Sequence, residues 1–105
     1  MIFVEKHTGC DMVIGLCTIE LYLPGNNSLK GKRSVLKSMI SRLRRKFNIS
    51  IAEVDLHDVW QSAVIGVACV SNQQSHAHKS LMQVIEWIES HRLDVDLVDY
   101  EIEML

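Results

Sequence analysis

The sequence is poor in the residues that build disulfide-rich or loop-rich proteins. Its 105 residues include one proline, five glycines and three cysteines. Cys10, Cys17 and Cys69 are an odd number without close spacing, and two of them lie inside apolar runs, where a thiol behaves as a small hydrophobe. We therefore expect reduced, buried thiols rather than a disulfide framework.

Long apolar segments are also missing. No run approaches the roughly 20 residues of a membrane span, and the first residues, MIFVEKHTGCD, lack the pattern of a secretory signal. We therefore expect a cytoplasmic protein. The chain is nevertheless 48% hydrophobic, and a domain of this length buries roughly two-thirds of its unfolded surface. One core without a structural metal or a cofactor is expected.

The patterns of enzymatic and metal sites are not legible either. His76 with His78, and His7 with Cys10, lack the helical i, i+4 spacing or CxxC partner of zinc sites. No nucleophile elbow is present, and the segment PGNNSLKGKRS is only a loose echo of a phosphate loop. The sequence therefore predicts no catalytic residues, and enzymatic activity is disfavoured.

The first half of the chain has the pattern of a strand followed by a helix. Residues 13–23 predict a strand with Thr18, Glu20 and Tyr22 on its polar face. Turn residues follow at 24–27, and Ser28 is placed to cap the helix. The apolar stripe of that helix consists of Leu36, Met39, Ile40, Leu43 and Phe47.

The second half predicts a hairpin, a helix and a last strand. Residues 48–56 and 63–70 form the hairpin, and Ser71 to Gln74 match a capping box for a helix that starts near Asn72 and ends near His91. The final alternating segment changes phase at Leu97-Val98, as a bulge would cause.

This order of elements is βαββαβ, and it predicts an α+β fold. Its usual solution is a ferredoxin-like plait, in which a four-stranded antiparallel sheet carries both helices on one face. We expect one such domain over residues 12–105, preceded by an N-terminal extension of residues 1–11 that is either an extra strand or disordered.

Two segments resemble a known family. SLKGKRSVLKSMISRLRRKFNISIAEVD and WQSAVIGVACVSN are similar to the YlxP-like bacterial proteins, a family classed as a domain of unknown function. The resemblance implies a ferredoxin-like fold and genes that often lie near those for translation initiation and ribosome maturation. It implies no established activity. The family often has an acidic residue where this chain has Gly31, so a weaker helix start is expected.

Charge is strongly separated along the chain. The net charge is −2, yet eight of the eleven basic residues lie in one segment without acidic residues. That segment carries +8, and the rest, with three basic and thirteen acidic residues, carries −10. The eight cations are Lys30, Lys32, Arg33, Lys37, Arg42, Arg44, Arg45 and Lys46.

A basic helix of this kind has two interpretations. It attracts phosphate backbones, and Lys30, Lys32 and Arg33 lie at a helix N-terminus that itself favours anions. Alternatively, it is a solvated face, or it pairs with the acidic last strand of its own or another subunit. That strand, with Asp94, Asp96, Asp99, Glu101 and Glu103 on its polar face, would repel RNA from the open side of the sheet.

These patterns lead to a ranked set of functional hypotheses. The first is a binding module for structured RNA or a ribosomal subunit that acts through the basic helix. The second is a homodimer formed through the open sheet face or a strand edge. The third is a regulatory plait that binds a phosphate or nucleotide. Trp60 has two interpretations: a stacking platform or contact anchor, or a packing residue. Packing is favoured, so Trp60 and Trp87 are expected to cover the end of the core or to join a subunit contact.

Overall fold

The computed structural model describes residues 11–91 and 94–105. The predictions for the segment before residue 11 lie outside the described residues. The elements are β1 (Val13–Tyr22), α1 (Leu29–Lys46), β2 (Ser50–Asp55), β3 (Ser62–Ser71), α2 (Gln74–Ser90) and β4 (Asp96–Met104). This order confirms the predicted βαββαβ arrangement.

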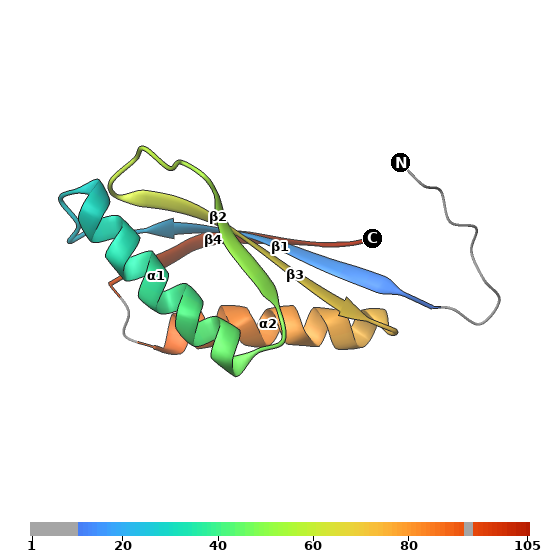
Figure 1. Cartoon of the computed structure of the whole chain (residues 1–105). Coiled ribbons are helices and arrows are strands. Elements are labelled where there is room, and N and C mark those ends of the chain that lie inside the picture. Colours follow the sequence, from blue (N-terminus) through green and yellow to red (C-terminus); the bar gives the residue numbers. More distant parts are fainter. Residues whose placement is uncertain (1–10, 92–93) are drawn as a thin grey trace.

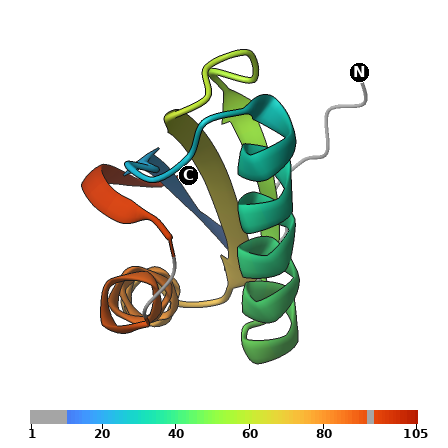
Figure 2. The same cartoon turned by 90° about the vertical axis from the view of Figure 1, so that its left-hand side faces the viewer.

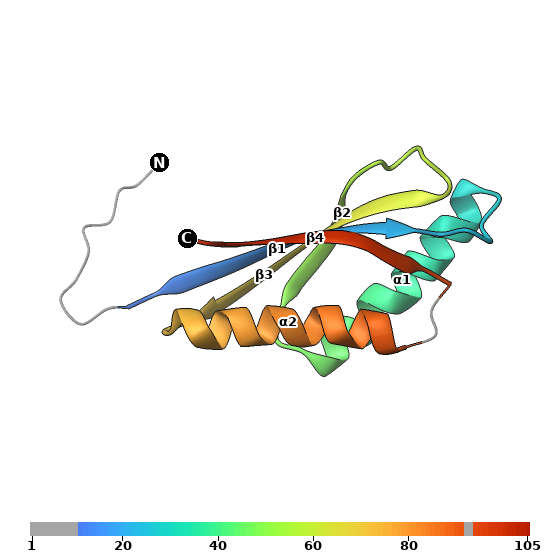
Figure 3. The same cartoon turned by 180° about the vertical axis from the view of Figure 1, so that it is seen from behind.

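The four strands form one antiparallel sheet in the order β2-β3-β1-β4. The sheet is strongly twisted, and both helices pack on one of its faces while running in different directions (Figures 1 and 2). Seen from behind, α2 and β4 lie in front of α1 and β2 (Figure 3). The predicted ferredoxin-like plait is therefore confirmed, with β2 and β4 as the two edge strands.

The core lies between the sheet and the helices, and its residues follow the predicted periodicities. Every second residue is buried from Gly15 to Leu21 in β1 and from Ala63 to Cys69 in β3. From α2, the stripe Ala77, Leu81, Val84, Ile85 and Ile88 completes the core. A Cβ added at Gly15 would lie 3.0 Å from Leu81 Cδ1, so α2 packs directly against the backbone of β1 at this residue.

The predicted change of phase in the last strand is a bulge. Glu20 pairs with Asp99 and the next residue, Leu21, pairs with Leu97. Val98 is left without a partner across the ladder, and it is exposed. The extra residue keeps Leu97 and Ile102 partly buried against the core although an even alternation would separate them.

The two helix starts differ from each other. Ser28 caps α1 as predicted, because its Oγ accepts a hydrogen bond of 3.0 Å from the Gly31 amide. The predicted capping box of α2 was wrong. Ser71 is still the last residue of β3, and the helix begins only at Gln74, with Gln73 as its N-cap. The Ser71 hydroxyl therefore accepts a hydrogen bond of 3.2 Å from the Gln73 amide, before the first turn of the helix.

Candidate nucleic-acid interface

Helix α1 carries all eight of the basic residues singled out above, and seven of them are exposed: Lys30, Arg33, Lys37, Arg42, Arg44, Arg45 and Lys46. Its apolar stripe is turned toward the sheet, with Leu36, Met39 and Leu43 buried and Ile40 and Phe47 partly buried. The amphipathic pattern therefore orients the helix so that most of its cations face solvent.

Lys32 has to be removed from the predicted anion-binding set. It is 0% exposed and lies on the buried stripe of α1, one turn before Leu36. The spacing from Lys32 to Leu36, Met39 and Leu43 is helical, so extending the apolar periodicity back by one turn would have indicated its burial. Lys32 was included in the predicted set for its charge, although its helical position is a buried one.

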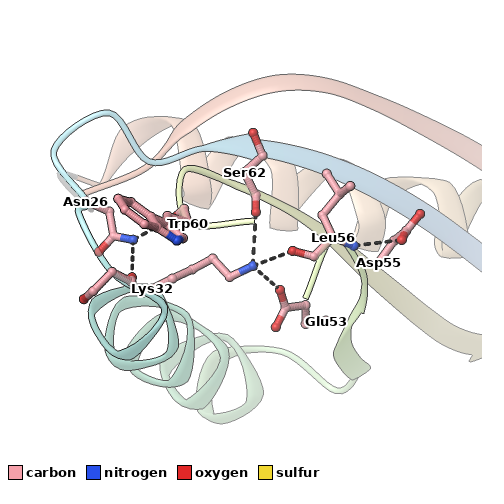
Figure 4. A network of polar contacts seen from close by, with 8 residues as sticks. Asn26, Lys32, Glu53, Asp55, Leu56, Trp60 and Ser62 are labelled. Atoms are coloured by element: carbon pink, nitrogen blue, oxygen red, sulfur yellow. Dashed lines mark hydrogen bonds and ion pairs between the residues drawn. The ribbon is translucent and has the colours of Figure 1, made fainter. Parts of the chain in front are cut away.

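The Lys32 ammonium satisfies its hydrogen-bonding capacity inside the protein (Figure 4). Nζ donates to the carbonyl of Leu56 at 2.7 Å and to that of Ser62 at 3.2 Å. It also forms an ion pair with Oε2 of Glu53 at 2.9 Å. Within the described residues Oε2 has no well-aligned hydrogen-bond donor, so the charge of Lys32 is what compensates this carboxylate.

Four of the exposed cations form a row along one side of α1. At 100° per residue, Lys30, Arg33, Lys37 and Arg44 fall within an arc of about 60°, and the row is about 21 Å long. It lies on the side of α1 that faces β2, because Nη2 of Arg44 donates to the Ile51 carbonyl at 2.9 Å. We call this row the basic flank.

The remaining three exposed cations point elsewhere around the helix. Arg42 lies on the side toward α2, where its guanidinium stands 5.0 Å from the centre of the Trp87 ring. Trp87 in turn stacks on His91, with ring centroids 4.0 Å apart. Arg45 and Lys46 are in the last turn, where cations interact favourably with the helix dipole.

The basic flank is not neutralised by the acidic residues of the same chain. Among residues 11–91 and 94–105, the one ion pair is that of Lys32 with Glu53. The exposed carboxylates of Asp99, Glu101 and Glu103 lie on β4, at the opposite edge of the sheet from β2. The basic helix and the acidic strand β4 therefore form no ion pair with each other among the described residues. Pairing within one subunit, one of the alternatives above, is not observed there.

The N-terminus of α1 is poorly suited to hold a phosphate. The pocket beside it is lined by Gly25, Asn26 and Gly31 but also by Asp94 and Asp96, whose carboxylates would repel an anion. The Gly31 amide already donates to Ser28. With Lys32 buried as well, the geometry disfavours the phosphate- or nucleotide-binding hypothesis.

The open face of the sheet is divided into two parts. Toward β4 it is acidic, with Glu20 paired across to Asp99 and Thr18 to Glu101. Toward β2 and β3 it is apolar, with Val70 69% exposed and Val54 54% exposed. A side chain added at Gly66 would come 3.0 Å from Cγ1 of Val54, so Val54 lies across the neighbouring strand and forms a continuous apolar surface with it.

The two tryptophans have different environments. Trp87 packs against the core as predicted. Trp60 is 53% exposed, so of its two predicted packing roles the covering of the core was wrong, and a subunit contact stays a prediction. It lies in the loop between β2 and β3, which projects beyond the helices at the end of the sheet where α1 begins (Figure 2).

Two of the predicted thiols are buried as expected. Cys17 and Cys69 are free and buried, and burial raises the pKa of Cys17 to about 11. This thiol therefore stays protonated at neutral pH.

His76 and His78 are exposed. Within the described part of the chain there is no group of three or more His, Cys, Asp or Glu side chains that could hold a metal ion.

Comparison with known sequences identifies the family. Residues 14–102 match the family model described as "Protein of unknown function (DUF503)". The chain belongs to the DUF503 family. A similar relative is the "Uncharacterized protein YlxP" of Bacillus subtilis strain 168, which is 38% identical over 78 residues, or 74% of this chain and 85% of the relative. The resemblance to YlxP-like proteins is confirmed, and neither description names an activity.

None of the described helices is long and apolar enough to cross a membrane.

Proposed function

We propose that this DUF503 protein binds structured RNA through the basic flank of α1. The observation that carries the proposal is the row Lys30, Arg33, Lys37 and Arg44, exposed on one side of α1 and without an ion pair among the described residues. Such a row attracts phosphates and releases their counterions on binding. A rigid helix also fixes the spacing between successive contacts.

The expected recognition is by shape and charge rather than by base sequence. Lysine and arginine contacts to phosphates position a protein on a nucleic acid but carry no sequence information directly. The acidic strand β4 disfavours the sheet face, so RNA would approach from the side of α1 and β2. The small ribosomal subunit is the first target to test, because it offers a large surface of structured RNA.

Two triple variants with the same change in net charge test the proposal. The first replaces Lys30, Arg33 and Lys37 with glutamine and removes most of the basic flank. The second, the control, replaces Arg42, Arg45 and Lys46, which lie outside it. Binding to small ribosomal subunits by co-sedimentation, and to a hairpin RNA by fluorescence anisotropy, is measured from about 50 to 200 mM salt.

The flank variant is expected to lose affinity for all RNA sequences alike, with a salt dependence shallower by about 2 to 3 in log–log slope. The control variant should change less in both respects. Equal losses in the two variants would show that net charge alone attracts RNA. Unchanged affinity in the flank variant at low salt, with both proteins folded, contradicts the proposal.

A second candidate function is self-association through the open sheet face, as a homodimer. The exposed apolar surface around Val54 and Val70 favours it, because contiguous exposed apolar surface often marks a contact site. Charge complementarity points to a second copy of this chain. The unpaired basic flank lies on the β2 side, and the exposed Asp99, Glu101 and Glu103 lie on the opposite edge strand, β4. The mass in solution of the parent and of Val54→Asp tests it, with a dimer expected only for the parent.

A further inference from the structure

The loop between β2 and β3 presents a tryptophan at the surface beside the beginning of α1. Trp60 is 53% exposed, and its neighbour Val59 is exposed as well. Tryptophan is enriched among the residues that contribute most to binding where proteins contact partners. Trp60 is therefore a candidate contact residue.

Both ends of this loop are held to the start of α1 by polar contacts (Figure 4). The buried ammonium of Lys32 binds the carbonyls of Leu56 and Ser62, which flank the loop on its two sides. Lys32 thus links α1 to both ends of the loop by hydrogen bonds. Leu56 adopts a left-handed conformation with φ of 60°, a strained backbone that the surrounding contacts maintain.

Trp60 itself is fixed to the segment that caps the helix. The side-chain amide of Asn26 donates to the Trp60 carbonyl at 2.6 Å and to the Ser28 carbonyl at 2.7 Å. The next residue is held as well, because the Leu23 amide donates a hydrogen bond of 2.8 Å to the Gln61 carbonyl. The Trp60 backbone therefore has a fixed position relative to the first turn of α1.

Gly31 takes part in this arrangement. A Cβ at residue 31 would overlap Oδ1 of Asn26, the same side chain that bonds Trp60. An acidic residue at this position, which was expected to strengthen the helix start, would push Asn26 away. The absence of a side chain at Gly31 thus leaves space for Asn26, whose amide donates to the Trp60 carbonyl. Glycine at this position does not itself stabilise the helix.

Cations and an aromatic ring then occur together at one end of the molecule. Lys30 and Arg33, the first two residues of the basic flank, lie in the first two turns of α1, against which the Trp60 loop is pinned. Proteins that bind unpaired nucleotides combine these two features, with cations along the backbone and aromatic rings on which bases stack.

From this geometry we propose that Trp60 stacks on an unpaired base of the RNA whose backbone lies along the basic flank. The inference rests on the proposed function and narrows its ligand to RNA in which an unpaired base adjoins a paired stem. The cations Lys30 and Arg33 are exposed on α1, so the backbone lies on the α1 side of Trp60. The loop contributes the stacking surface alone.

Two RNAs with the same stem test the inference, one a hairpin with an unpaired loop and the other a fully paired duplex. Trp60→Leu keeps an apolar side chain but removes the aromatic ring, and it is expected to weaken hairpin binding about tenfold. Binding of the duplex should stay unchanged. Trp60→Phe should restore most of the hairpin affinity, and Val59→Ala in the same loop is the matched control.

Fluorescence gives an independent readout of stacking. The chain has two tryptophans, so in a Trp87→Phe background Trp60 is the single emitter. The hairpin should quench it strongly and the duplex weakly. Circular dichroism and urea unfolding establish that each variant is folded.

The outcomes separate this inference from the proposed function. If the flank variant weakens both RNAs while Trp60→Leu binds the hairpin like the parent, the stacking inference is overturned and RNA binding stands. If Trp60→Leu lowers the mass of the protein in solution without changing RNA affinity, Trp60 is a self-association contact and the inference is overturned too. If the parent binds neither RNA at low salt, the proposed function itself fails.

Discussion

The two helices of this protein bury similar stripes against the same sheet, yet they differ in what they carry. The buried stripe of α2 is entirely apolar, from Ala77 to Ile88, whereas that of α1 begins with the charged Lys32. Seven exposed cations surround α1, and Lys79 is the only lysine or arginine of α2. Helix α2 thus completes the core, while α1 combines packing with a charged surface and a pinned loop.

The largest effect is expected where α1 departs from α2, at Lys32. Lys32→Ala leaves the buried Oε2 of the partly exposed Glu53 uncompensated and two carbonyls without a donor, so we expect a loss of about 3 kcal/mol in the free energy of unfolding. Urea denaturation measures it, with Lys30→Ala in the same turn expected to stay within about 0.5 kcal/mol.

A second variant sharpens that result. Lys32→Met with Glu53→Gln removes both charges and should recover part of the loss, because an uncompensated buried charge is costlier than a neutral polar pair. If Lys32→Ala cost no more than Lys30→Ala, the network of Figure 4 would have no structural role.

A smaller loss is expected where α2 meets the sheet. In Gly15→Ala the new methyl group would lie 3.0 Å from Leu81 Cδ1 and 3.3 Å from Ala77 Cβ, which forces α2 outward at a cost of about 1 to 3 kcal/mol. Thermal unfolding should show a lower midpoint. Gly25→Ala, where nothing lies within 4 Å of the added atom, is the control, and equal midpoints for the two variants would contradict the close packing of α2.

The helix caps provide a third contrast. Ser28→Ala removes the acceptor of the Gly31 amide and should destabilise the protein by about 1 kcal/mol. Ser71→Ala should have a smaller effect, since its hydroxyl caps no helix. Hydrogen exchange of the Gly31 amide by NMR gives the local readout. Unchanged exchange in Ser28→Ala would argue against the cap.

The smallest effect concerns the contact between the two helices. Arg42→Ala removes a guanidinium from the exposed side of Trp87, and such contacts contribute about 0.5 kcal/mol at exposed sites. The unfolding midpoint should fall by roughly 3 °C, and Trp87 emission should change. Arg45 stacks on no aromatic ring within residues 11–91 and 94–105, so Arg45→Ala should leave that emission as it is.

Much of the fold could be predicted because it depends on local patterns. The alternation in β1, the stripes of both helices and even the unpaired Val98 follow from the spacing of apolar residues. The capping of α2 was predicted wrongly for a nonlocal reason. Ser71 pairs with Val13 in the sheet, so β3 continues through Ser71 and the N-cap position falls two residues later, at Gln73.

The candidate site was predicted in part. Residue types and helical spacing alone determined that α1 is basic and that most of its cations lie outside the core-facing stripe. Helical spacing places Lys32 on the core-facing stripe, but only the tertiary structure supplies the partners of its buried charge. These are Glu53, Leu56 and Ser62, which lie more than twenty positions away. The same holds for Trp60, whose place beside α1 is set by Asn26 from a distant loop and leaves no trace in local periodicity.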